Sequence, residues 1–258
     1  MLPRVAATAL LLLVTACTGG VADEEEKVEV APPKLGTCRL LTPADIKEPS
    51  NESPGVDCGE KHTAETFAVG TFPDELGDDV EDPALGAHVF EVCERKFRKF
   101  LGGNESLVMR AMVTWAWFRP SAEQWDAGAR WWRCDVVGGG EASTELVDLP
   151  ETAAGLLLGR PADEGRVCVD GPSIDESAKI PCSEPHTWRA VTTIVLGDEK
   201  DPYPGDRLVE VRTRDYCSDS VGAWLNYPVD YDFGFTWFHE AEWEAGNRRS
   251  ICWARTEQ

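Results

Sequence analysis

The chain has 258 residues and a formal net charge of −21, so it is long enough for two small domains with an acidic surface. A surface of this sign excludes nucleic-acid binding, because recognition of phosphate needs basic patches. It also argues against flat adsorption on anionic lipid.

The first 16 residues are expected to be a signal peptide. Arg4 is followed by an apolar run over residues 5–14 that is too short to span a bilayer in the mature protein. Residues 14–17 (Val-Thr-Ala-Cys) resemble a bacterial lipobox, which implies cleavage before Cys17 and attachment of lipid, such as palmitate, to this cysteine. The protein would then be an exported lipoprotein, anchored by lipid to the outer face of the cytoplasmic membrane. The alternative is an ordinary signal peptide followed by an incidental cysteine.

Residues 17–35 are expected to form an acidic tether. Residues 23–26 are all acidic, and Pro32 and Pro33 favour an extended chain. The negative charge of this segment would repel the membrane and hold the domains away from it.

One pattern of cysteine and histidine occurs twice in the rest of the chain. A cysteine is followed by a histidine four residues later and by a second cysteine 35 residues later, and each copy closes with Trp-x-x-Gly-x-Arg before a last cysteine. Agreement at both ends predicts a duplicated domain, with copies at 36–140 and 165–258 and a linker at 141–164. The pattern residues are Cys58, His62, Cys93, Trp125, Gly128, Arg130 and Cys134, then Cys182, His186, Cys217, Trp243, Gly246, Arg248 and Cys252.

Both copies have the same expected order of elements: a strand with the first cysteine, a strand after the histidine, a helix, and closing strands. In the first copy these elements are expected at 37–41, 66–72, 84–101, 107–118 and 129–136. In the second copy they are expected at 166–169, 190–196, 206–225, 234–238 and 248–254, and a short helix over 153–158 is expected in the linker. The fold class is therefore α+β, with two repeated small disulfide-stapled domains, each a mostly antiparallel sheet with one packed helix.

The cysteine count supports export. Removal of Cys17 from the nine cysteines leaves eight, four in each copy, and such a set indicates structural disulfides in an oxidising compartment. Identical pairing within both copies leaves three possibilities. We favour the pairs Cys38–Cys58, Cys93–Cys134, Cys168–Cys182 and Cys217–Cys252. Zinc binding by cysteine and histidine is the alternative, and the unusual spacing argues against it.

The repeated pattern resembles the septum formation domain, a family of actinobacterial envelope proteins that are often lipoproteins and often carry two copies. Residues 182–186 (Cys-Ser-Glu-Pro-His) are similar to the hallmark of that family, and residues 58–62 differ from it by Lys61. The glutamate that the family often has three residues after the histidine is matched by Glu65 but not by Arg189. The resemblance covers most of the mature chain. It implies a link to cell division or envelope growth and no defined activity.

No catalytic or metal-binding signature is recognised, and no cofactor is expected. Residues 239–243 begin like a zincin helix, but Trp243 occupies the place of the second histidine. His62 and His186 could contact a ligand or respond to pH, because histidine titrates near neutral pH. We favour a structural role, with each ring hydrogen-bonded to the backbone in the turn after a cysteine. A structural role is also expected for the repeated residues Trp125, Trp243, Gly128, Gly246, Arg130 and Arg248.

Trp117, Trp131 and Trp132 have no tryptophan at the equivalent positions of the second copy and form a candidate binding surface. Strand alternation places Trp131 and Trp132 on opposite faces, so at least one of them is expected to point outward. Burial between the two domains is the alternative. A surface that is acidic and aromatic suits a cationic protein segment better than an anionic polymer.

The sequence therefore predicts a non-enzymatic extracytoplasmic lipoprotein that binds an envelope protein partner, in cell-envelope or septum assembly. The first alternative is a protein that binds cell-wall glycan or peptidoglycan through the same tryptophans. An envelope hydrolase is the third possibility, and it would need one carboxylate or histidine on which turnover depends.

Overall fold

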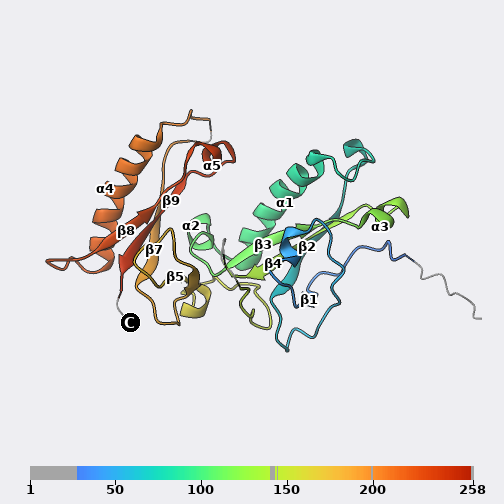
Figure 1. Ribbon diagram of the computed structural model, residues 1–258, viewed down its shortest axis with the longest axis horizontal. Helices are drawn as coiled ribbons and strands as arrows, with labels where there is room; N and C mark the ends of the chain where they lie inside the picture. The colour runs from blue at the N-terminus through green and yellow to red at the C-terminus, as the bar shows by residue number, and fades with distance from the viewer. Residues whose placement is uncertain (1–27, 140–142, 144, 199, 257–258) are drawn as a thin grey trace, which may run out of the picture.

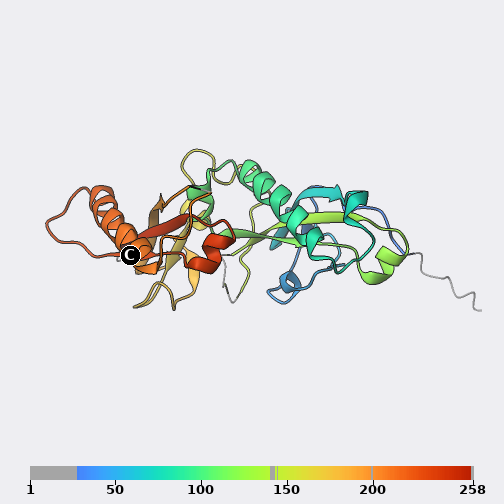
Figure 2. The same ribbon diagram turned by 90° about the horizontal axis from the view of Figure 1, so that it is seen from above.

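The computed structural model describes residues 28–139, 143, 145–198 and 200–256, and in this part of the chain it contains two antiparallel sheets that lie side by side (Figures 1 and 2). The expected signal peptide, the lipid anchor at Cys17 and the first part of the tether lie outside the described residues. None of the described helices combines the length and the apolar character that crossing a membrane requires.

The first sheet has four strands in the order β1-β2-β4-β3. They are β1 (Cys38–Arg39), β2 (Ala64–Thr71), β3 (Val113–Phe118) and β4 (Trp131–Gly138). All neighbouring strands are antiparallel, and every residue of the central β4 is buried. Burial of both faces of β4 means that both sides of this sheet are covered.

Helix α1 (Pro83–Leu101) covers one face of the first sheet. The Asp82 side chain accepts from the N–H of Ala84, and Gly102 ends the helix in the left-handed conformation. The helix buries one stripe of residues at a spacing of four, namely Leu85, Val89, Cys93, Phe97 and Leu101. This helix agrees closely with the one expected over 84–101.

The second sheet has five strands in the order β6-β5-β7-β9-β8. They are β5 (Val167–Val169), β6 (Lys179–Pro181), β7 (Trp188–Val195), β8 (Phe233–Thr236) and β9 (Arg249–Arg255). Helix α4 (Asp206–Trp224) packs on one face and buries Val209, Thr213, Cys217 and Val221. Strand β6 was not expected, because Lys179–Pro181 has neither apolar alternation nor length.

The two sheets share their irregularity as well as their order. Strands β2 and β4 shift register between Thr66 and Ala68, and strands β7 and β9 shift register between Ala190 and Thr192. The four disulfides are Cys38–Cys58, Cys93–Cys134, Cys168–Cys182 and Cys217–Cys252, the pairs that the sequence favours. In each sheet one bridge ties the first strand to the loop that leads into β2 or β7, and the other joins the long helix to β4 or β9.

Two expected elements are wrong. The strand expected from residue 107 is preceded by helix α2 (Glu105–Val108), because the Asn104 side chain caps the N–H of Leu107 and starts a helical turn. The helix expected over 153–158 is a series of turns, in which Gly155 and Gly159 have positive φ angles of 73° and 67°.

Two further short helices, neither of them expected, and three 3-10 turns complete the fold. Helices α3 (Ala122–Asp126) and α5 (Glu240–Glu244) each begin with a capping box and lead into the closing strand. The short 3-10 turns are η1 (Asp45–Lys47), η2 (Asp74–Leu76) and η3 (Asp163–Gly165).

The segment expected as a linker belongs to the core of the first sheet. Leu149, Ala153 and Leu157 are buried together with α1 and β4. The N–H of Leu157 donates to the carbonyl of Leu101 at 2.8 Å, and the N–H of Leu149 donates to the carbonyl of His62 at 2.9 Å. This segment is therefore packed and hydrogen-bonded rather than a free spacer.

The two sheets contact each other directly. The N–H of Met112 donates to the carbonyl of Gly165 at 3.0 Å, and Arg110 Nη1 donates to the carbonyl of Val191 at 2.7 Å. Arg249 Nε and Glu105 Oε2 form an ion pair at 2.7 Å. These contacts hold α2 against β7 and β9.

Candidate binding surface

The two histidines of the repeated pattern are buried in the turns before β2 and β7. His62 and His186 are 1% and 3% exposed. In each ring Nδ1 lies within hydrogen-bond distance of a backbone carbonyl two residues earlier, that of Glu60 at 2.8 Å and that of Glu184 at 2.7 Å. Nε2 of both rings is also buried. Neither ring is available to a ligand at the surface, and both are held in the turn that follows a disulfide.

The repeated tryptophans and arginines form stacked pairs. The guanidinium of Arg130 lies 4.1 Å from the ring centre of Trp125, and that of Arg248 lies 3.6 Å from the ring centre of Trp243. Each guanidinium also donates to the carbonyl of the tryptophan on which it stacks. Gly128 and Gly246 turn the chain between the partners at φ angles of 99° and 98°, where a residue with a Cβ would be strained. The pairs fix the corner before β4 and β9.

Two of the three tryptophans proposed as a binding surface are buried, and this prediction is wrong. Trp131 and Trp132 are 6% and 4% exposed. Trp132 lies under α1, where its ring is 5.3 Å from Lys96 Nζ. Gly70 leaves room for it, because a Cβ there would lie 2.2 Å from the ring. Both faces of the first sheet are covered, so alternation along β4 exposes neither tryptophan.

Trp117 lies at the edge of the first sheet. It is half-buried on β3, and a Cβ at Gly86 of α1 would lie 3.3 Å from its ring. Trp115 on the same strand packs against Phe90, with 5.5 Å between the ring centres. Only part of this aromatic edge is therefore open to a partner.

A buried ion cluster lies on the face of the first sheet that is turned away from α1. Asp135 is fully buried and contacts Arg133 at 3.1 Å and Arg39 at 3.7 Å, and it accepts from the hydroxyl of Thr66 at 2.7 Å. Burial lowers the pKa of Arg39 and of Arg133 below the ordinary value, and the charge of Asp135 opposes this effect. The cluster has two cations for one carboxylate, but it has no access to solvent and no space for a substrate.

Glu65 and Arg189 occupy the same position in the two sheets, and both bind the connecting segment. Glu65 Oε2 accepts from the N–H of Ala153 at 2.7 Å, and Arg189 forms a short ion pair with Asp163. The hydrogen bond from Arg189 lowers the pKa of Asp163 below its ordinary value. The sequence singled out this pair of positions, and the structure shows that each holds the connection between the sheets.

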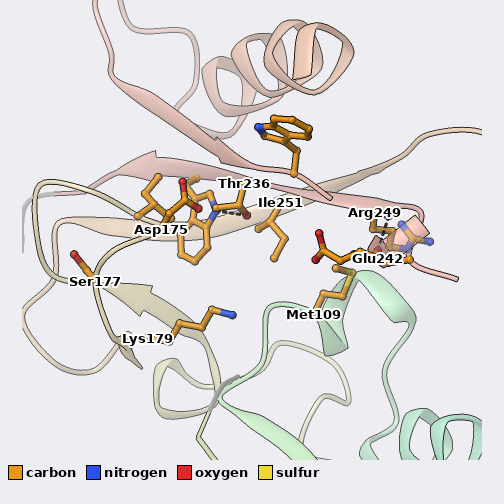
Figure 3. Close-up of a pocket in the computed structure, with 12 residues that line it drawn as sticks. Met109, Asp175, Ser177, Lys179, Thr236, Glu242, Arg249 and Ile251 are labelled. Atoms are coloured by element: carbon orange, nitrogen blue, oxygen red, sulfur yellow. Dashed lines mark hydrogen bonds between the residues drawn. The ribbon is translucent and has the colours of Figure 1, made fainter. Parts of the chain in front are cut away.

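An open cavity of about 370 Å³ lies on the face of the second sheet that is turned away from α4 (Figure 3). Ile251 and Trp253 of β9 and Ile174 of the preceding loop contribute apolar surface to it. Charged side chains line it from four different segments, namely Asp175, Lys179, Glu242 and Arg249. Met109 reaches it from the first half of the chain. We call this space the second-sheet cavity. The sequence pattern did not indicate it, because its lining residues come from five separate segments.

A second surface feature follows helix α4. The 224–229 loop contains Trp224, Tyr227 and Val229, of which Trp224 is 48% and Tyr227 is 74% exposed. It projects beyond the rest of the second half (Figures 1 and 2). The exposed acidic residues Asp219, Asp230 and Asp232 lie near it in sequence, and two of them line a shallow hollow of about 390 Å³ beside Leu225 and Pro228. Exposed apolar groups of this kind indicate a site of association.

The described residues offer no arrangement of acids, bases and nucleophiles that indicates a reaction. The described parts of the chain hold no group of three or more histidines, cysteines, aspartates or glutamates placed to bind a metal. The clearest cluster of polar side chains is Tyr203, Asp206 and His239, in which the tyrosine hydroxyl donates to the aspartate. That hydrogen bond lowers the pKa of Asp206 below its ordinary value. The carboxylate lies at the exposed start of α4 and lines neither of the two cavities described above.

Comparison with known families gives one match. A family model described as septum formation matches residues 35–252, a range that includes all four disulfides and both sheets apart from the last three residues of β9. No curated protein and no solved structure matches the chain.

Proposed function

Because the chain belongs to the septum formation family, we propose that it is an exported, lipid-anchored envelope protein that binds a protein partner during envelope or septum assembly. It acts as an interaction module and not as an enzyme. Its lipid is attached at Cys17, and the acidic segment up to residue 35 separates the sheets from the membrane.

Export is supported by the cysteines. All eight cysteines after Cys17 are paired in four disulfides, which are typical of proteins that fold in an oxidising compartment. Each bridge closes a loop of 14 to 41 residues and contributes about 3–4 kcal/mol to stability in the chain-entropy model. Small sheets of this kind depend on such bridges.

A duplicated unit is the second part of the proposal. The copies extend over 36–140 and 165–258, and Leu149, Ala153 and Leu157 of the connecting segment pack against the first copy. The same register shift, the same two disulfides and the same stacked tryptophan and arginine occur in both sheets. A single unit that was duplicated explains all of these agreements at once.

The observation that carries the binding function is the exposed 224–229 loop. Tryptophan, tyrosine and valine side chains stand in solvent after helix α4, in a chain whose net charge is −21. Aromatic groups at the centre of a contact supply most of its binding free energy, and acidic groups around them select the partner. The partner that fits this loop is a protein segment that is basic and partly apolar.

Crosslinking on intact cells tests this proposal. A tagged full chain is compared with the double variant Tyr227→Ser and Val229→Ser and with the control Leu40→Ser, which removes an equally apolar side chain that is 59% exposed in the first half. We expect one recurrent protein partner with the wild type and the control, and its loss with the double variant. Recovery of wall fragments in place of a protein would support the glycan-binding alternative. Equal capture by all three chains would contradict the role of the loop.

A further inference from the structure

The two sheets differ in the length of the loop that follows their first strand. In the first sheet the cysteines at the ends of this loop, Cys38 and Cys58, are 20 residues apart. In the second sheet the matching cysteines, Cys168 and Cys182, are 14 residues apart. Both loops cover the face that is turned away from the long helix, and Ile46 and Ile174 pack there. The shorter loop can cover less of that face.

Residues 49–51 of the longer loop, which follow the η1 turn, lie against the end of β3 and β4. The carbonyl of Pro49 accepts from the N–H of Arg119 at 2.9 Å. The hydroxyl of Ser50 donates to the carbonyl of Pro120 at 3.0 Å, and Asn51 Oδ1 accepts from Arg133 at 3.0 Å. The first sheet therefore binds a polypeptide segment at this place, and that segment is part of its own loop.

The matching positions of the second sheet line the cavity. Strand pairing places Thr236 opposite Ile251 where the first sheet has Phe118 opposite Arg133, so Trp237 takes the place of Arg119. Thr236, Trp237 and Ile251 all line the second-sheet cavity. Among the described residues, none accepts from the N–H of Trp237 as Pro49 does from that of Arg119. The cavity is thus the space that a loop segment fills in the first sheet.

The lining of the cavity favours a peptide over a single charged ligand. The floor is apolar, because Trp253 and Ile251 replace Asp135 and Arg133 of the first sheet. Arg249 at the rim is already paired with Glu105. The carboxylate of Glu242 accepts from the N–H of His239. A ligand that carries only charge would find two of the four charged side chains already engaged, whereas an apolar side chain finds an open floor.

We propose that the second-sheet cavity is a docking site for an extended peptide segment of a partner protein. The segment lies where residues 49–51 lie on the first sheet. One of its carbonyls accepts from the N–H of Trp237, and one apolar side chain rests on Ile174, Ile251 and Trp253. Main-chain hydrogen bonds with a pocket for one side chain are a common mode of peptide recognition at a sheet edge. This site is separate from the 224–229 loop, and the inference does not rest on the binding function proposed for that loop.

A displayed library of random decapeptides, selected on the disulfide-bonded full chain, tests the inference. We expect enriched peptides that share one apolar residue. The variant Thr236→Phe places in the cavity the side chain that the first sheet has at Phe118, and it should weaken binding of these peptides at least about tenfold. The control Thr71→Phe makes the same exchange at an exposed strand position of the first sheet and should leave binding unchanged.

Hydrogen exchange on the wild-type chain gives a second measurement, which does not depend on the folding of a variant. We expect the enriched peptide to protect the amide of Trp237 and the loop around Ile174. Failure to enrich any peptide, unchanged binding to a folded Thr236→Phe chain, or protection confined to the 224–229 loop would each overturn the inference. Unchanged peptide binding to Thr236→Phe, together with capture of a partner on cells by the wild type and equally by Thr236→Phe, would overturn the inference and leave the proposed function intact.

Discussion

The face turned away from the long helix is polar and filled in the first sheet but apolar and open in the second. The first sheet has a buried ion cluster, made of Arg39, Thr66, Arg133 and Asp135. The strand registers place four apolar residues at the corresponding positions of the second sheet, namely Val169, Ala190, Ile251 and Trp253. The exchange includes all four positions of the cluster, whereas at a neighbouring position the first sheet has Phe118 and the second has Thr236.

This difference shows that two sheets with the same strand order can treat this face differently. The first sheet binds its own loop there, whereas the second sheet leaves the face open. Charged residues can be buried under the longer loop because Asp135 balances the arginines and Asn51 accepts from one of them. Under the shorter loop unpaired charges would have no such partners, and apolar residues form the floor instead. A face of this kind is available to a peptide because the chain itself does not cover it.

The largest expected effect is on the ion cluster. Asp135→Ala leaves two buried guanidinium groups without a carboxylate and should lower the free energy of unfolding by about 3–5 kcal/mol. Addition of Arg133→Ile, which copies the second sheet, should restore part of that loss because it removes one of the unpaired cations. Urea unfolding followed by tryptophan fluorescence measures both. If the free energy of unfolding of Asp135→Ala were within about 1 kcal/mol of the wild-type value, the arginines would not depend on Asp135 for their burial.

Removing each of the two short-loop disulfides in turn distinguishes an effect on stability from an effect on peptide binding. Replacement of both cysteines by serine in Cys38–Cys58 or in Cys168–Cys182 should cost about 3 kcal/mol each, because the closed loops have similar lengths. Only loss of Cys168–Cys182 frees the loop that carries Ile174 and should also weaken the peptides selected on the cavity. Thermal unfolding and peptide titration of both variants check this. Equal loss of peptide binding in both would contradict the assignment of the cavity to the second sheet alone.

A smaller effect is expected for the residue that holds the connecting segment. Glu65→Ala leaves the buried N–H of Ala153 without its acceptor and should cost about 1–3 kcal/mol. The amides of 149–157 should then exchange faster with solvent. Glu60→Ala removes an exposed glutamate nearby and is the matched control. If exchange of 149–157 were the same in both variants, Glu65 would not be what anchors this segment.

The smallest effect is the pH dependence of the contact between Asp163 and Arg189. The pKa of Asp163 is lower in the folded chain than in the unfolded chain, so the contact stabilises the fold above the unfolded pKa of about 3.9 and is lost as pH falls below it. Asp163 is half-exposed, and we expect about 1 kcal/mol or less. The free energies of unfolding of the wild type and of Asp163→Asn, measured from pH 7 to pH 3, should converge at the acid end of this range. A difference that is constant with pH would exclude this contact as its source.

Local patterns predicted the helices and the disulfides well. The spacing of Leu85, Val89, Cys93 and Phe97 places α1 within one residue of its observed start, because a helix that packs on a sheet repeats its apolar side every three or four residues. The repeated spacing of the cysteines left three pairings, and the one that we favoured is observed. The short helices α3 and α5 were missed, since five residues carry too little periodicity to stand out.

The prediction failed where long-range contacts decide burial. At least one of the rings of Trp131 and Trp132 was expected to be exposed, but both are buried. Helix α1 covers one face of β4, and the loop with Ile46 packs on the other. The segment with Leu149 and Leu157 looked like a linker, because its few apolar residues have no helical or strand period. Neither outcome could be obtained from neighbouring residues.

The sequence by itself determined the repeated cysteine framework, the two long helices, the strands that carry the disulfides and the resemblance to the family that the chain belongs to. Only the tertiary structure decided which aromatic residues are exposed, which segment covers each sheet and where the cavity lies. The reason is physical: periodicity and spacing report contacts between residues near in sequence, whereas the cavity is lined by segments that run from Met109 to Trp253 and meet only when the chain has folded.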